Sequence, residues 1–334
     1  MLETMPSSLS PRARVLIAFG AVYLFWGSTY AAIHIAGEHL PPPVVSATRS
    51  IITTVLILAI ALATGKSLRV PKGEGPKLAI VGLLFMSGNN MLLTWGETMV
   101  PSGFASLLVS TMPIMIALME RVLPGGEPLN KRGWAGTLFG TTGIAVLVWP
   151  SLHHANLHMF QRGSAATGSQ AGMGTIICLL AALSFAIGSV LSRRFHFRAD
   201  TFIATGWQIG AASLFNVSFA LIAGSFHRAV WTWRGCEAIV YLSIFGSLVG
   251  LVAFTYLLQN VAVSKVATYA FVNPMIAVLL GVMLLGERLA PTELIGMGII
   301  VCAVAMVVLS RVGGTSSQKV LDREIMATAG GAEE

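Results

Sequence analysis

Residues 15–36 read VLIAFGAVYLFWGSTYAAIHIA and contain no Asp, Glu, Lys or Arg. A helix of about 20 apolar residues is long enough to cross the ~30 Å hydrocarbon core of a bilayer. Because an unpaired backbone amide costs several kcal/mol in lipid, a stretch of this length must cross as a helix. It exceeds the ~7 to 15 residue apolar region of a signal sequence and ends in no small-residue cleavage site, so we expect it to remain attached.

The composition of the whole chain indicates that lipid is its solvent. Only 10% of the 334 residues are charged, against about a quarter in soluble domains. Hydrophobic residues make up 55%, and the mean hydropathy is +0.77. These values exclude a soluble enzyme and a nucleic-acid binder. The three cysteines, Cys178, Cys236 and Cys302, lack metal-ligand spacing, so we expect no disulfide framework, zinc site or other cofactor.

Apolar runs of helix length recur along the chain and predict ten crossings. Their expected ranges are 15–36, 44–64, 77–98, 102–121, 133–150, 171–192, 201–223, 236–258, 265–285 and 292–310. An even number of crossings puts both termini on one side of the bilayer. By our assignment 16 of the 21 Lys and Arg lie on that side, four lie opposite (Arg162, Arg228, Arg234 and Lys265) and Arg49 lies within a span. Since cytoplasmic loops carry the excess of Lys and Arg, both termini are expected in the cytoplasm.

The chain also resembles itself. A shift of 161 positions places Gly27-Ser28 on Gly188-Ser189, Thr94-Trp95 on Thr255-Tyr256, and Pro113 on Pro274. A shift of 160 then aligns Glu127, Leu129 and Gly136 with Glu287, Leu289 and Gly296. Because five helices is an odd number, the second copy enters the membrane from the other side. The sequence therefore predicts an all-α membrane protein built from two inverted five-helix repeats, an arrangement typical of secondary transporters with a substrate site between the repeats.

The expected organisation has five parts. They are a cytoplasmic tail (1–14), a first repeat (15–150), an external linker (151–170), a second repeat (171–310) and a disordered cytoplasmic tail (311–334). The linker holds His153, His154 and His158, whose spacing matches no standard ligand pattern, so we interpret it as a solvated loop and not as a metal site.

Prolines at matched positions predict interrupted helices. Pro113 and Pro274 fall near the middle of the fourth and ninth spans, where proline removes an amide donor and bends a helix. Either proline alone fits a packing kink equally well, but the pair favours a hinge or a cavity edge. Asn273, directly before Pro274, would then present its amide to the cavity.

Several short motifs resemble a known family. They are Trp26-Gly27-Ser28-Thr29-Tyr30, Pro101-Ser102-Gly103, Tyr269 through Asn273-Pro274, and Gly286-Glu287-Arg288-Leu289. In this order, with ten spans and a duplicated layout, they are similar to the EamA branch of the drug/metabolite transporter superfamily, in particular to the YedA-type exporters of bacterial inner membranes. The resemblance runs from about residue 15 to 310. It implies a ten-helix basket around a central cavity, in the bacterial inner membrane, that exports small metabolites, amino acids or drugs.

Polar side chains within the spans are candidates for cargo contact, because such groups are expensive in lipid and face a cavity or one another. Arg49 either pairs with Glu97, which lies at comparable depth and would fix helix packing, or attracts a carboxylate of the cargo. Gln208 occupies the position near Arg49 in the second copy. Asn89 and Asn90 point about 100° apart, so one is expected to line the cavity and the other to bond a neighbouring helix.

Aromatic side chains complete the candidate lining, although each of them also fits ordinary packing or an interfacial belt. The full set of cavity candidates is Trp26, Ser28, Tyr30, Arg49, Asn89, Asn90, Trp95, Glu97, Gln208, Tyr256, Tyr269 and Asn273, with Pro113 and Pro274 as hinges.

A solute carrier that works by alternating access is the leading functional hypothesis, with a small molecule and the lipid bilayer as its partners and one chain as its working unit. An intramembrane enzyme would need a nucleophile or metal set at membrane depth, and the chain shows neither an HExxH motif nor paired membrane aspartates. A channel would need filter rings, for which there is no sign. Facilitated diffusion and proton coupling through Glu97 both remain open.

Overall fold

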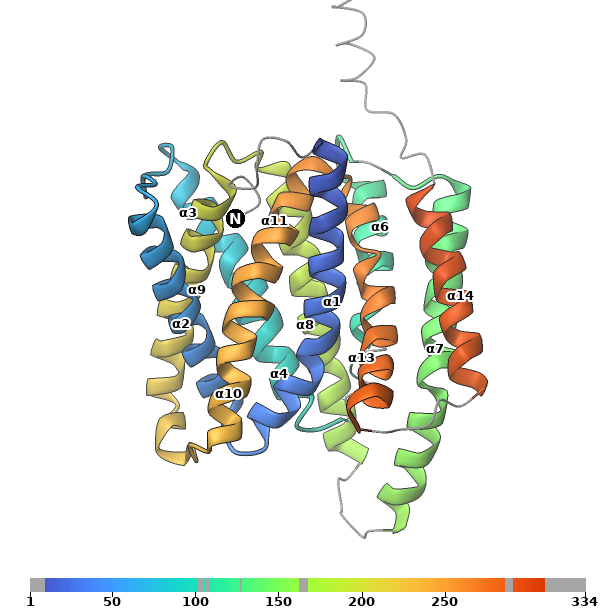
Figure 1. The fold of residues 1–334 in the computed structure, drawn as a ribbon. Helices are drawn as coiled ribbons and strands as arrows, with labels where there is room; N and C mark the ends of the chain where they lie inside the picture. Colours follow the sequence, from blue (N-terminus) through green and yellow to red (C-terminus); the bar gives the residue numbers. More distant parts are fainter. Residues whose placement is uncertain are drawn as a thin grey trace, which may run out of the picture.

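The computed structural model describes residues 10–100, 105, 108–126, 128–161, 168–285 and 291–309, which form a bundle of helices (Figure 1). Helices lie in each of the ten ranges expected from the sequence. Within the described residues, five helical stretches are long and apolar enough to cross a membrane: Arg12–Gly37, Pro42–Ala63, Glu74–Gly96, Gly172–Arg194 and Trp233–Asn260. A shorter apolar helix covers Leu294–Val307.

The first half of the chain supplies seven of the labelled elements over the described residues. These are α1 (Pro11–Gly37), α2 (Pro42–Ala63), α3 (Glu74–Gly82), η1 (Leu83–Met91), α4 (Leu92–Gly96), α6 (Met112–Val122) and α7 (Lys131–Gln161).

The second half contains α8 (Gly168–Arg194), α9 (Thr201–Ile222), the short η2 (Ser225–Arg228), α10 (Trp233–Tyr241), η3 (Leu242–Val249), α11 (Gly250–Asn260), α12 (Val263–Val266), α13 (Tyr269–Leu285) and α14 (Pro291–Val308).

Helix ends follow local sequence signals. Pro42 opens α2, where its missing N–H costs nothing. The Asp200 carboxylate accepts from the backbone N–H groups of Phe202 and Ile203 at 2.9 and 3.1 Å and so caps α9, while it also forms an ion pair with Lys66. The Thr232 hydroxyl caps α10 by accepting from Gly235 N at 3.1 Å.

The predicted linker 151–170 is helical over its described residues, 151–161 and 168–170, which corrects its interpretation as a solvated loop. Helix α7 continues to Gln161, and α8 begins at Gly168. Residues 151–161 contain no Gly or Pro that would end a helix. Apolarity marks where a helix leaves the membrane, whereas the helix itself continues, here past Pro150. The predicted tail 311–334 and the motifs at 101–103 and 286–289 lie outside the described residues.

The first helix of each half packs against matching elements of the other half. Helix α1 contacts α10, η3, α11 and α13, and α8 makes the equivalent contacts with α3, η1, α4 and α6. The pairs α2 with α9 and α7 with α14 join equivalent helices. In Figure 1, α1 and α8 run in opposite directions, and α1 begins at the same end of the bundle at which α14 ends.

Lys265 lies at the end of the bundle opposite to the one assigned from the sequence. Arg193, in the last turn of α8, donates to the carbonyl oxygens of Leu258 and Gln259 at 3.1 and 2.8 Å. Helix α12, which contains Lys265, follows α11 after a short connection. It therefore lies at the end of the bundle where α8 ends and α1 begins (Figure 1).

The third and eighth helical segments are both widened in the middle into π-helix. These sections are η1 and η3, and the 161-residue shift places the start of η1 on Ile244, inside η3. π-Helical turns are rare and occur mostly at functional sites. No pattern in the sequence predicts them, because a π-turn depends on how side chains pack around the helix and leaves no apolar signature of its own.

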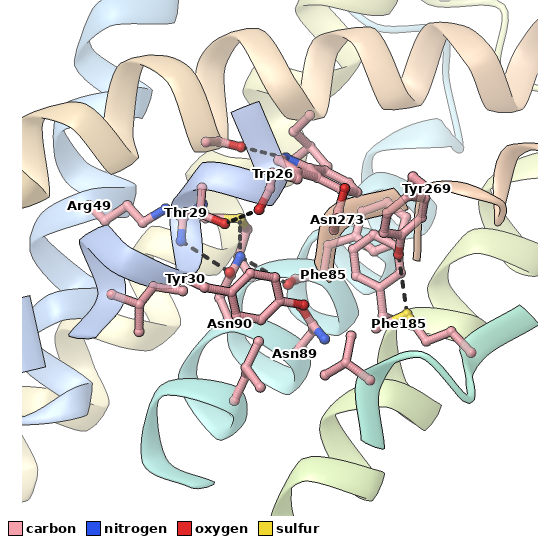
Figure 2. Close-up of a pocket in the computed structure, with 17 residues that line it drawn as sticks. Trp26, Thr29, Tyr30, Arg49, Phe85, Asn89, Asn90, Phe185, Tyr269 and Asn273 are labelled. Atoms are coloured by element: carbon pink, nitrogen blue, oxygen red, sulfur yellow. Dashed lines mark hydrogen bonds between the residues drawn. The ribbon is translucent and has the colours of Figure 1, made fainter. Parts of the chain in front are cut away.

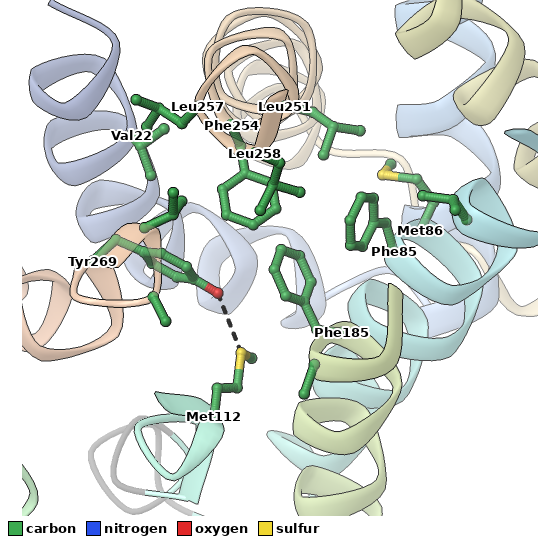
Figure 3. Packing of buried hydrophobic residues seen from close by; sticks show 14 of the residues in the cluster. Val22, Phe85, Met86, Met112, Phe185, Leu251, Phe254, Leu257, Leu258 and Tyr269 are labelled. Carbon is green, nitrogen blue, oxygen red and sulfur yellow. Dashed lines mark hydrogen bonds between the residues drawn. The ribbon is translucent and has the colours of Figure 1, made fainter. Parts of the chain in front are cut away.

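An aromatic cluster fills the centre of the bundle, formed by Trp26, Phe85, Phe185, Phe254 and Tyr269. Figure 3 shows the last four of these rings. Ring centroids lie 4.9 Å apart for Trp26 with Phe254 and with Tyr269, and 4.7 Å apart for Phe85 with Phe185. Such offset and edge-to-face pairs contribute beyond the apolar area that they bury. The cluster joins helices from both halves of the chain.

Candidate functional site

A pocket lies between the two halves, beside the aromatic cluster (Figure 2). The first half lines it with Trp26, Thr29, Tyr30, Ile33, Arg49, Phe85, Met86, Asn89, Asn90, Leu93, Val109 and Met112, and the second with Phe185, Gly246, Leu251, Tyr269 and Asn273. Its volume is about 60 Å³. Ligand pockets typically measure ~300–1,000 Å³, so this conformation has room for water molecules and not for a metabolite.

Arg49 extends from α2 into this pocket and is only 5% exposed. Its Nε donates to Ser247 Oγ at 2.6 Å, and its Nη1 donates to Asn90 Oδ1 at 3.1 Å. Both acceptors belong to the π-helical sections: Asn90 is in η1 and Ser247 is in η3. The guanidinium therefore connects the two widened helices through neutral partners.

The expected Arg49–Glu97 pair is absent over the described residues. Arg49 binds Ser247 and Asn90 instead, and the buried carboxylate oxygens of Glu97 accept no hydrogen bond there. Comparable depth in two spans does not bring two side chains together, since the rotation of each helix decides which neighbour its side chain faces.

Asn89 and Asn90 contact different neighbours, as the 100° separation predicts. Asn89 Nδ2 donates to the carbonyl oxygen of Ala181 on α8 at 3.0 Å, while Asn90 accepts from Arg49 on α2. Both residues nevertheless line the pocket, which corrects the expectation that only one does. The pocket extends around η1 far enough to reach both faces.

Trp26 fastens α1 to the second π-helical section. Its indole Nε1 donates to the carbonyl oxygen of Gly246 at 2.8 Å. Gly246 itself has no room for a side chain, because an added Cβ would lie 2.9 Å from both Arg49 Nη2 and Thr29 Cγ2. A glycine at this position therefore permits the close approach of α1, α2 and η3.

The two prolines occupy different local structures. Pro113 is in the first turn of α6, directly after the turn at residues 110–111, so the fourth segment is broken there instead of kinked. Pro274 lies inside α13, and a turn at residues 267–268 precedes that helix. Asn273 lines the pocket, is 3% exposed, and its Oδ1 accepts no hydrogen bond from the described residues.

Seven of the twelve cavity candidates line the pocket: Trp26, Tyr30, Arg49, Asn89, Asn90, Tyr269 and Asn273. The other five, Ser28, Trp95, Glu97, Gln208 and Tyr256, lie outside it.

Local packing explains why several of these five lie elsewhere. Ser28 bonds the hydroxyl of Tyr241 at 2.6 Å, and Trp95 is 36% exposed with its ring against Phe219. Gln208 is fully buried against α3. Tyr256 packs on the main apolar core, away from the pocket.

Sequence reasoning missed the apolar part of the lining. Phe85 and Met86 adjoin the polar run Ser87–Asn90, and this adjacency is the sequence signal that could have identified them. Phe185 stands in an ordinary apolar run, so nothing in its neighbourhood distinguishes it from a lipid-facing residue. The described residues contain no group of three or more His, Cys, Asp or Glu that could hold a metal ion.

The family assignment rests on a twofold match. Residues 13–149 and residues 172–309 each match the EamA-like transporter family. The chain belongs to this family. An EamA domain is thus present twice, and the pocket lies between the two copies.

Relatives that match this EamA chain over most of its length support the same assignment. The inner membrane transporter YedA of Escherichia coli K12, itself uncharacterized, is 33% identical over 88% of this chain and 90% of its own length. The uncharacterized transporter YoaV of Bacillus subtilis is 24% identical over 88% of this chain and 96% of its own. A solved crystal structure, 23% identical, superposes with a TM-score of 0.71 over 88% of this chain and 97% of that one, which shows a shared fold.

Proposed function

We propose that this EamA protein is an alternating-access transporter of the bacterial inner membrane, which exports small metabolites such as amino acids, or drugs, through the pocket between its two repeats. The observation that carries the proposal is that both repeats line one pocket, at the level where the third and eighth segments are π-helical. Secondary transporters bind cargo at such a repeat interface, at interrupted helices.

The proposed topology has ten spans, an inverted second repeat and both termini in the cytoplasm. The exchanged contacts of the two halves support it, as do the opposite directions of α1 and α8 in Figure 1. Protease or thiol labelling of the ends in intact cells tests it, and termini on opposite sides of the membrane would contradict it.

The aromatic cluster is proposed as the closed gate on the cytoplasmic side. Four of its members, Trp26, Phe85, Phe185 and Tyr269, line the pocket, and about one turn nearer the start of α1 the Tyr23 hydroxyl is hydrogen-bonded to Thr268 Oγ1 at 2.8 Å. Helix α1 belongs to the first repeat and Thr268 to the second, so this contact must break when the repeats separate on that side. The pocket of about 60 Å³ must then widen before it accepts cargo.

Counterflow in liposomes containing the purified protein tests the carrier mechanism. Labelled amino acids and cationic drugs are offered outside vesicles preloaded with the same unlabelled solute. Saturable accumulation that depends on the preloaded solute supports a carrier. Conductance without counterflow, or product formation without solute movement, would reject it in favour of a channel or an enzyme.

Asn273→Ala supplies a variant for the same assay. Its amide faces the pocket with an unpartnered oxygen over the described residues, so the substitution is expected to reduce counterflow more than it reduces the amount of folded protein. Equal losses of both would assign Asn273 to folding instead.

Energy coupling is tested separately at Glu97. Its carboxylate lies outside the pocket, so we propose facilitated transport, in which a pH gradient drives no flux and Glu97→Gln leaves exchange intact. Loss of pH-driven flux with intact exchange would show proton coupling through this residue.

A further inference from the structure

Arg49 brings a positive charge into the pocket without a counter-charge. In the part of the chain that the structure describes, no carboxylate lies within ion-pair distance of it, and both of its hydrogen-bond acceptors are neutral. A guanidinium stays protonated in proteins, so the charge cannot be removed by loss of a proton. A buried charge of this kind is costly unless an opposite charge joins it.

The guanidinium also keeps a donor group for a ligand. Its Nε and Nη1 are engaged by Ser247 and Asn90, whereas Nη2 lies beside Gly246 in the pocket wall and has no hydrogen-bond partner among the described residues. Hydrogen bonds from a guanidinium to a carboxylate are charge-assisted and strong, so the N–H groups of Nη2 match a carboxylate oxygen as their acceptor.

The rest of the wall is apolar and aromatic. Trp26, Phe185 and Tyr269 are in mutual ring contact on one side of the pocket, with centroids 4.9–6.1 Å apart. Walls of this kind suit a flat apolar body.

We propose that the pocket, once widened beyond its volume of about 60 Å³ in this conformation, binds solutes that combine a carboxylate with a flat apolar body, with the carboxylate on Arg49 and the body against Trp26, Phe185 and Tyr269. This inference names the class of cargo. It rests on the proposed transport function only in taking the pocket as the path of the cargo, because binding to the pocket is measured without transport.

Equilibrium binding to the purified, detergent-solubilised protein tests the charge requirement directly. Four probes are titrated by calorimetry: indole-3-acetate, its neutral isostere indole-3-acetamide, the cation tryptamine, and acetate, which lacks the apolar body. We expect indole-3-acetate to bind at least tenfold more tightly than the amide, which is about 1.4 kcal/mol, and more tightly than tryptamine and acetate. Equal or tighter binding of the amide or of tryptamine, or no binding of any probe at millimolar concentration, would overturn the proposal.

The variant Asn90→Asp locates the site. It keeps Arg49 and nearly keeps the shape of the side chain, but it places a carboxylate on the atom that Nη1 contacts at 3.1 Å. The internal anion should then replace the external one, so the affinity for indole-3-acetate falls to that for the amide. The same substitution at exposed Asn260, at the end of α11, is the matched control and should leave binding unchanged. A preference for carboxylate that survives in Asn90→Asp would remove Arg49 from the site.

Transport readouts separate this inference from the proposed function. If the carboxylate preference holds in binding but no probe shows counterflow, the carrier mechanism fails and the site stands. If tryptamine and indole-3-acetate exchange at the same rate, the carrier stands and the anion site fails.

Discussion

Gly246→Ala is expected to disturb the pocket wall without changing its charge or polarity. The added Cβ would lie 2.9 Å from Arg49 Nη2 and from Thr29 Cγ2, whereas ordinary van der Waals contact begins at 3.4 Å. Each neighbour must therefore move by about half an ångström. The guanidinium yields poorly, because its Nε bond to Ser247 at 2.6 Å and its bond to Asn90 hold it in place. Overpacking of this kind typically costs about 1–3 kcal/mol.

Gly210→Ala in α9 is the matched control. The nearest atom to its added Cβ is Thr54 Cγ2 at 3.7 Å, which is ordinary contact. Both glycines lie within helical segments, so both variants gain the preference of helices for Ala, about 1 kcal/mol. That gain is common to the two variants, and their difference in unfolding free energy isolates the overpacking.

Reversible unfolding by SDS in mixed micelles measures this difference. We expect Gly246→Ala to be about 1–3 kcal/mol less stable than Gly210→Ala, and its affinity for indole-3-acetate to fall because the guanidinium is displaced. Equal stability of the two variants would refute the reasoning that Arg49 is held tightly against the wall of η3.

Three further substitutions probe other contacts. Trp26→Phe keeps an apolar ring but leaves the Gly246 carbonyl without its donor, so we expect a loss of about 1–3 kcal/mol in SDS unfolding and slower counterflow; unchanged values would show that this bond is dispensable. Tyr23→Phe removes the bond to Thr268 across the proposed gate, so it should cost about 1 kcal/mol and raise the exchange rate, and slower exchange would contradict the gate. Asp200→Ala removes the cap of α9, so it should lower stability by about 1 kcal/mol without altering indole-3-acetate affinity in calorimetry, because the residue lies outside the pocket; weaker binding would contradict that separation.

Local sequence was sufficient for the helices and for the duplication. Apolar length marks a membrane-spanning segment residue by residue, and the 161-residue shift compares the chain with itself, so neither requires knowledge of neighbours. The polar residues Arg49, Asn89, Asn90 and Asn273 were found for the same reason, since their cost in lipid is a property of each side chain.

The partners of those residues were decided only by the tertiary structure. Arg49 meets Ser247, which is 198 positions away, and not Glu97, and the apolar wall at Phe85 and Phe185 looks in sequence like any other lipid-facing surface. The π-helical sections, the break at Pro113 and the course of α7 beyond Pro150 were likewise invisible. Composition along one chain determines which segments enter the bilayer and how often the unit repeats, whereas the rotation and depth of each helix, which arise from close packing between segments, determine which side chains meet.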